Sequence, residues 1–95
     1  MIDVQVRDLP EEHRYHALVG GEVAGVIFYR DTGDDRIIRH TEVSAAFEGK
    51  GVGSALAKAA LDDVRAKGKQ VRPNCPFVAD WIERHPDYRD LVHMG

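Results

Sequence analysis

The sequence lacks long apolar runs and long runs of one charge, and it contains a single cysteine. A membrane-spanning helix needs about 20 consecutive apolar residues, so none is predicted. Cys75 has no partner for an intramolecular disulfide, which is typical of a protein from a reducing cytoplasm. Residues 1–14 contain acids and no apolar segment of the signal-peptide kind, which also favours a cytoplasmic location.

Clustered basic residues and metal-ligand spacings are absent as well. The formal net charge is -3 and the chain has no basic stripe, so we expect no nucleic-acid partner. His13, His16, His85 and His93 do not follow the spacing of metal ligands, so we predict no metal site. The sequence carries no signal of its oligomeric state.

What the chain does contain is enough for one small domain. It has 95 residues, of which 43% are hydrophobic, so we expect a single domain over residues 1–95 with one modest core. Because so small a domain buries a limited fraction of its surface, a bound ligand or a partner subunit would add to its stability.

The first half of the chain alternates apolar and polar residues, which is the period of β-strands. Gly20-Gly21 favours a hairpin, because glycine reaches positive φ without steric cost. Residues 8–12 break the first strand, and residues 31–35 form a polar turn. These signals predict a meander of antiparallel strands that contain Val4 and Val6, residues 15–19, residues 22–29 and residues 36–44.

The second half changes to helical spacing. A helix is predicted from the apolar positions Val52, Leu56, Ala59, Ala60 and Val64. Gly68 stands where a left-handed C-cap is expected, and residues 70–72 form a short strand. Residues 77–84 fit a second helix with Phe77, Trp81 and Ile82 as its apolar face. The fold class is therefore α/β (α+β), with a mixed, mostly antiparallel sheet and two main helices.

A glycine-rich turn, Glu48-Gly49-Lys50-Gly51-Val52-Gly53, joins the last of these four strands to the first helix. The first N–H groups of a helix lack internal partners and lie at the positive end of its dipole, so such a turn suits a phosphate or pyrophosphate. Lys50 adds a cation. The residue order fits neither the mononucleotide P-loop nor the dinucleotide fingerprint. The alternative is that the glycines only form a tight strand-to-helix turn.

Several segments carry a likeness to a known family. Gly51-Val52-Gly53 after a strand matches the acyl-CoA signature R/Q-x-x-G-x-G/A, with Glu48 in the position of Arg or Gln. Residues 40–43 (HTEV), 73–78 (PNCPFV) and 85–88 (HPDY) extend the match over nearly the whole chain. With these features the sequence resembles the GCN5-related N-acetyltransferase (GNAT) superfamily, and within it the small YjdJ-type branch. The resemblance implies a compact GNAT-like fold and acetyl-CoA (coenzyme A) as cofactor.

The resemblance also implies a binding site. Residues 40–44 would pair with the pantetheine arm, and the turn amides would hold the pyrophosphate. Asn74 would bond the pantetheine amides, unless it is only a turn residue. The Glu48 carboxylate would weaken phosphate binding unless its side chain points away. The implied cofactor-binding residues are Glu42, Val43, Glu48, Gly49, Lys50, Gly51, Val52, Gly53, Ser54 and Asn74.

Acetyl transfer from a thioester to an amine needs a neutral amine, a donor for the carbonyl oxygen and a departing thiolate. Amides near Glu42 and Val43 are candidate donors. The candidate catalytic residues are His40 as base, Glu42 as base through water, and Cys75 as an acetyl-accepting nucleophile. His40 and Glu42 would project from the same face of a strand. The alternatives are a structural histidine, a solvated glutamate and a buried apolar cysteine.

The predicted function is N-acetyltransfer from acetyl-CoA to an amine on an unidentified acceptor, either a small molecule or a protein. The alternative is an acyl-CoA-binding or protein-interaction module with little or no catalysis. That alternative is kept because the chain lacks the longer N-terminal helical region in which larger acetyltransferases often hold their acceptors.

Overall fold

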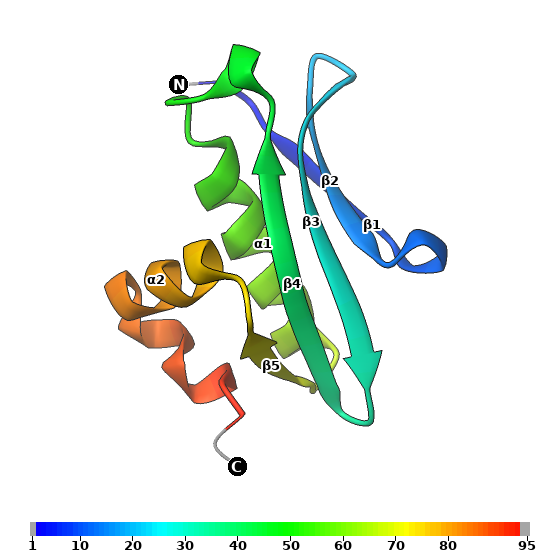
Figure 1. Cartoon of the computed structure of the whole chain (residues 1–95), viewed down its shortest axis with the longest axis vertical. Coiled ribbons are helices and arrows are strands. Elements are labelled where there is room, and N and C mark those ends of the chain that lie inside the picture. The colour runs from blue at the N-terminus through cyan, green and yellow to red at the C-terminus, as the bar shows by residue number, and fades with distance from the viewer. Residues whose placement is uncertain (1, 94–95) are drawn as a thin grey trace.

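The computed structural model describes residues 2–93 (Figure 1). Three 3₁₀ helices, at Pro10–Glu12, Ala45–Phe47 and Pro86–Leu91, connect or follow the main elements. The strands and helices, in chain order, are β1 (Gln5–Leu9), β2 (Arg14–Val19), β3 (Glu22–Thr32), β4 (Asp35–Val43), α1 (Val52–Ala66), β5 (Gln70–Pro73) and α2 (Pro76–Arg84). This arrangement confirms the predicted mixed sheet with two main helices.

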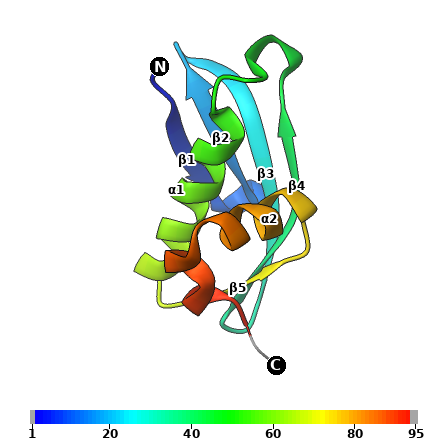
Figure 2. The same ribbon diagram turned by 90° about the vertical axis from the view of Figure 1, so that its left-hand side faces the viewer.

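The five strands form one sheet in the order β1-β2-β3-β4-β5. The first four are antiparallel neighbours, and β5 joins β4 in parallel after the α1 crossover. Both α1 and α2 lie on the same side of the sheet, as Figures 1 and 2 show. The other side, called the open face below, has no helix packed over it within residues 2–93.

Most predicted boundaries hold to within a few residues, and the exceptions have local causes. The predicted polar turn at residues 31–35 is shorter than expected, because Asp31 and Thr32 belong to β3 and Asp35 opens β4. Likewise, Asp8 and Leu9 pair with β2 instead of breaking β1. Phe77 was predicted on the buried face of α2 but is 39% exposed. The buried face of α2 contains Val78, Trp81 and Ile82.

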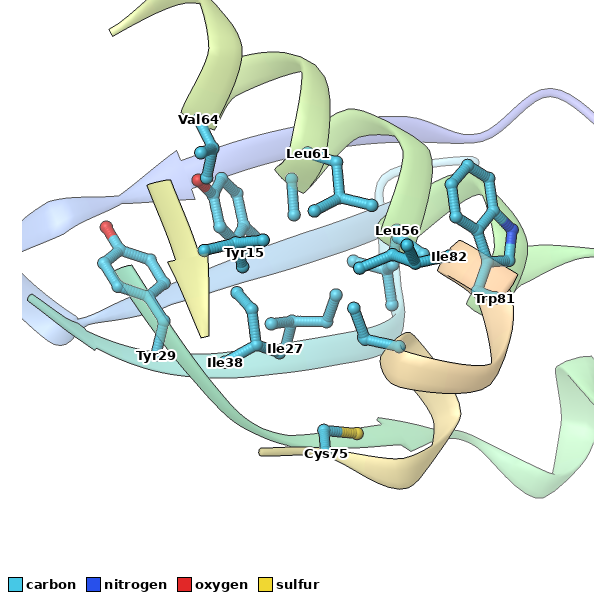
Figure 3. Close-up of a cluster of buried hydrophobic side chains, with 14 of the residues drawn as sticks. Tyr15, Ile27, Tyr29, Ile38, Leu56, Leu61, Val64, Cys75, Trp81 and Ile82 are labelled. Atoms are coloured by element: carbon cyan, nitrogen blue, oxygen red, sulfur yellow. The ribbon is translucent and has the colours of Figure 1, made fainter. Parts of the chain in front are cut away.

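The core lies between the sheet and the two helices (Figure 3). Leu56 and Leu61 of α1 pack in one cluster with Ile27 and Ile38 of the sheet. A Cβ atom added at Gly25 of β3 would lie 3.0 Å from Leu56 Cδ1. The missing side chain at this position therefore lets the start of α1 approach the sheet closely.

One buried polar cluster ties the far end of α1 to the sheet. The Arg36 guanidinium donates to both Asp31 oxygens at 2.8 and 3.0 Å and to Asp63 Oδ2 of α1 at 3.1 Å. It also lies 4.0 Å from the ring centroid of Tyr29 and donates to Tyr15 Oη at 2.6 Å. These bonds satisfy a cation that is 3% exposed.

Within this cluster, the pKa values of Asp31 and Asp63 lie below the ordinary value of an aspartate. The Arg36 hydrogen bond is the main reason why the pKa of Asp31 lies below its ordinary value. Burial opposes the ionised form of Asp63, but hydrogen bonds from Lys67 and Tyr15 outweigh it and lower the pKa of Asp63. Burial, followed by the bond to Asp63, raises the pKa of Tyr15. The cluster is therefore built around ionised aspartates.

Candidate functional site

The first turn of α1 leaves its backbone donors uncapped. Gly51 is the N-cap, with φ 83° and no side-chain capping hydrogen bond, and Gly49 has φ 76°. Such angles are costly for residues with a Cβ atom, so these two glycines set the shape of the turn. The first α-helical bond runs from Ala55 N to Gly51 O at 3.0 Å. The preceding helical amides, at residues 52–54, are therefore available to an external acceptor.

These amides border a cavity of about 380 Å³ between the start of α1 and α2. The part of the predicted cofactor set that lines it comprises Val43, Glu48, Gly49, Gly51, Val52, Gly53 and Ser54. Lys50, Glu42 and Asn74 do not line it. The glycine turn and the end of β4 are thus brought together at one hollow, and Glu48 is part of its wall.

The opposite wall of the cavity comes from α2, which was not predicted from the sequence to belong to this site. Trp81 Nε1 donates to Ser54 Oγ at 2.8 Å, so α2 is fastened to the first turn of α1. His85 stacks on Trp81 with 3.7 Å between ring centroids. Phe77 and Arg84 also line the cavity. The spacing of these four residues on one face of a helix was the signal available in the sequence.

Gly53 is glycine for a steric reason, unlike Gly49 and Gly51. A Cβ atom there would lie 2.8 Å from Phe77 Cζ, which is closer than such atoms normally approach. The missing side chain therefore makes room for the Phe77 ring, as well as for any ligand above the turn.

The strands β4 and β5 separate beside this cavity. Their parallel pairing runs from Asp35–Gln70 to Ile38–Pro73, where β5 ends, while β4 continues to Val43. Because proline has no N–H, Pro73 ends the ladder. Residues 39–43 of β4 therefore have a neighbouring strand on one side only.

The pairing with β3 shows which β4 groups face the gap. Ser44 N donates to Ala24 O at 2.8 Å, and ladder groups alternate along an antiparallel strand. The amides of His40 and Glu42 thus face β3, whereas those of Thr41 and Val43 face the gap. The open backbone donors near the predicted position are therefore at residues 41 and 43, and the Glu42 amide belongs to the sheet.

The three catalytic candidates lie on two different faces. His40 and Glu42 project from the open face, with His40 Nε2 3.5 Å from Glu42 Oε2, and their side chains are 63% and 62% exposed. Cys75 lies on the helix side, is 3% exposed, and has its Sγ 3.4 Å from Thr41 Oγ1 (Figure 3). The cysteine is thus a small buried residue at the point where β4 and β5 separate.

Three further observations concern Tyr88, metal binding and membrane-spanning helices. The Tyr88 hydroxyl donates to Asp62 Oδ1 at 2.7 Å, and this bond raises the pKa of Tyr88. Within residues 2–93, no three side chains of the His, Cys, Asp and Glu types gather as a metal site would require. Over the same residues, no helix has the length and apolar character needed to cross a bilayer.

The sequence model of the GCN5-related N-acetyl-transferase family matches residues 14–91, which include the cavity, the separated strands and α2. The chain belongs to this family. A GCN5-like protein of Staphylococcus aureus, solved in solution by NMR, superposes with a TM-score of 0.73 at 25% identity, over 98% of this chain and 91% of that one. Ard1 of Thermoplasma volcanium superposes with a TM-score of 0.61 at 26% identity, over 83% and 55% of the two chains.

Among curated sequences, the GNAT chain is similar to the protein NATD1 of Gallus gallus. The two are 33% identical over 57 residues, which is 60% of this chain and 52% of that protein. The chain spans about half the length of this relative. Membership and fold together support acetyl transfer as the general chemistry of the family to which this chain belongs.

Proposed function

We propose that the chain binds acetyl-CoA across the first turn of α1 and the gap beside β4, and transfers its acetyl group to an amine. The observation that carries this proposal is the uncapped start of α1, which opens into the same cavity as the end of β4. An anion-binding helix terminus and a half-paired strand edge together suit a ligand with a pyrophosphate and an amide-containing arm.

The residues of the cavity fit the charge and shape of such a ligand. The amides of residues 52–54 would hold the pyrophosphate, and Arg84 would add a cation at the rim, where it now pairs with Asp80 at 3.2 Å. The gap-facing backbone carbonyls of Thr41 and Val43 would accept hydrogen bonds from the amide groups of the pantetheine arm, which leaves the N–H groups of these residues for the transfer step. Bound there, acetyl-CoA would supply an acetyl group activated as a thioester.

The chain would contribute a base and oxyanion donors to the transfer. His40 would accept the proton that the amine loses, directly or through water, and Glu42 Oε2 lies 3.5 Å from His40 Nε2. The gap-facing amides at residues 41 and 43 would donate to an oxygen on which negative charge develops. Because Cys75 is buried and lies on the other face from His40, direct transfer to the amine is the simpler route.

Binding can be tested separately from stability with Ser54→Asp. An acid in the first turn favours the helix dipole and can still accept the hydrogen bond from Trp81 Nε1, but it repels a phosphate. We therefore expect acetyl-CoA affinity, measured by calorimetry, to fall at least about tenfold, while the unfolding free energy stays the same or rises. Lys58→Gln, which makes the same change in net charge one turn later, is the control. Unchanged affinity in Ser54→Asp would contradict the assigned phosphate site.

The base can be tested with His40→Gln. We expect the rate of CoA thiol release with the best amine from a broad screen to fall by about a hundredfold, with little change in acetyl-CoA affinity. His16→Gln, on the same face, is the control. A rate that is unchanged between the two variants would remove His40 from the mechanism.

A binding module without efficient catalysis is the second candidate, and the high exposure of His40 and Glu42 favours it. Catalytic bases are usually held more rigidly than solvent-exposed side chains. Acetyl-CoA binding without thiol release for any amine in the screen would support this module over the enzyme. Incubation with acetyl-CoA followed by mass spectrometry would show whether Cys75 gains an acetyl group.

A further inference from the structure

The open face of the sheet carries a set of arginines that the proposed chemistry does not use. The strand register places Arg7, Arg14, Arg30 and Arg72 on this side, opposite to α1 and α2. Arg14 Nη2 forms an ion pair with Glu12 Oε1 at 3.2 Å, and Arg72 Nε donates to Oδ2 of the buried Asp35 at 2.7 Å.

Two of these cations are unpaired. Arg7 and Arg30 are exposed, and neither makes an ion pair or a side-chain hydrogen bond with any other residue in the range 2–93. An unpaired guanidinium on a rigid strand is pre-positioned for a planar anion, because its donors form a fixed fork.

The middle of the open face is apolar. Phe28 is half-buried, with the Arg14 guanidinium 5.5 Å from its ring centroid and the His40 ring stacked at 6.3 Å. Val26 and Ile37 are half-buried beside it. A partner would therefore meet an apolar centre that has guanidinium groups around it, which is a common composition for a protein interface.

The two sides of the molecule differ in how their charges are paired, and the chain as a whole has a net charge of -3. On the helix side, Asp62, Asp80, Glu83 and Asp90 form ion pairs with Lys58, Arg84, Arg89 and Arg65, respectively. Among the strand residues of the range 2–93 whose side chains lie on the open face, Glu42 is the exposed acid. Its side chain lies beside His40, the base proposed above.

From this distribution we infer that the open face docks an acidic segment of a protein, and that this segment presents the amine to be acetylated. The arginines would pair with carboxylates of the segment, and Phe28 would contact its apolar atoms. Glu42 would attract a positively charged lysine that lies among these carboxylates. The second half of the inference, which names the acceptor, rests on the proposed function.

A polypeptide fits this face better than a nucleic acid does. A lysine or a chain terminus supplies a strongly nucleophilic amine, whereas the exocyclic amines of nucleobases are weaker nucleophiles because their lone pairs are delocalised into the ring.

The test uses a fluorescent peptide with one lysine among aspartates and glutamates, measured by anisotropy in a buffer of low salt. A peptide with asparagine and glutamine in place of the acids, and a single-stranded oligothymidylate, are the comparison ligands. We expect the acidic peptide to bind tightest. The double variant Arg7→Gln/Arg30→Gln should weaken it about fivefold, because each exposed charge pair contributes a fraction of a kcal/mol.

The matched control is Lys58→Gln/Arg89→Gln, which removes the same charge from the helix side and should leave peptide binding unchanged. Equal losses in both variants, or an acidic peptide that binds no better than the neutral one, would overturn the docking site. Tighter binding of the oligothymidylate would overturn the choice of a polypeptide.

Mass spectrometry of the same peptides after incubation with acetyl-CoA tests the acceptor. We expect the lysine of the acidic peptide to be acetylated faster than that of the neutral one. Peptide and acetyl-CoA binding without acetylation would overturn the acceptor assignment. Peptide binding without any acetyl-CoA binding would instead contradict the proposed function and leave the docking site in place.

Discussion

At the scale of single residues, Glu48 departs from the acyl-CoA signature that the sequence resembles. It lines the cavity and stands in the position of an Arg or Gln, so its carboxylate opposes the charge that the helix start attracts. Arg84 on the facing wall supplies a charge of the opposite sign. In the proposed complex, the two side chains would act on the same pyrophosphate in opposite directions.

Glu48→Gln is therefore expected to tighten acetyl-CoA binding by about two- to fivefold, since it removes a repulsion in a solvent-exposed setting. Arg84→Gln should weaken binding by a similar factor. Calorimetry at two salt concentrations checks both, because the effects should shrink as salt rises. If Glu48→Gln does not change affinity, the carboxylate points away from the phosphates.

At the scale of elements, the end of α1 is set by Gly68, which follows the C-cap Lys67 and has φ 66°. Lys69 N and Gly68 N close the helix end through bonds to Val64 O and Arg65 O. Gly68→Ala is expected to lower the unfolding free energy by about 1 kcal/mol, because a Cβ atom disfavours left-handed angles.

Urea unfolding measures this loss, and Gly68→Asn serves as the comparison because asparagine tolerates left-handed angles better. It should cost less than half as much as alanine. Both variants should bind acetyl-CoA normally, since Gly68 lies at the other end of α1 from the cavity. Equal stability of the alanine variant and the natural chain would refute the expected backbone strain.

The elements also show what the sequence could predict. The glycine turn could be predicted from the sequence, because Gly49 and Gly51 favour positive φ angles and a helical pattern follows them. The spacing of the α2 residues indicated that they share one face, but the sequence could not predict that this face borders the cavity, because the position of α2 depends on where β5 ends and on the bond from Trp81 to Ser54. The open amides at residues 41 and 43 depend on strand register, which short alternating patterns do not determine.

At the scale of the whole molecule, the cluster around Arg36 links stability to pH. The pKa values of Asp31 and Asp63 are lowered in the folded state. Their contribution is therefore complete above the unfolded value of about 3.9 and is lost as the pH falls through the lower folded values.

We expect the unfolding free energy to change little on account of these groups from about pH 7 to pH 5, and to fall steeply below about pH 4. The double variant Asp31→Asn/Asp63→Asn should be less stable at neutral pH and show a shallower fall in acid. Urea titrations across this range measure both. Glu22→Gln, at an exposed hairpin, is the control, and an equally shallow acid fall in it would remove the cluster as the cause.

The half-paired stretch of β4 has a consequence for isotope exchange. Amides that face β3, at His40 and Glu42, are bonded within the sheet, whereas those of Thr41 and Val43 face the gap. Deuterium should therefore enter positions 41 and 43 quickly and positions 40 and 42 slowly, so that exchange rates alternate along a single strand. Addition of CoA should slow the two fast positions, and this change would report the occupied gap one amide at a time.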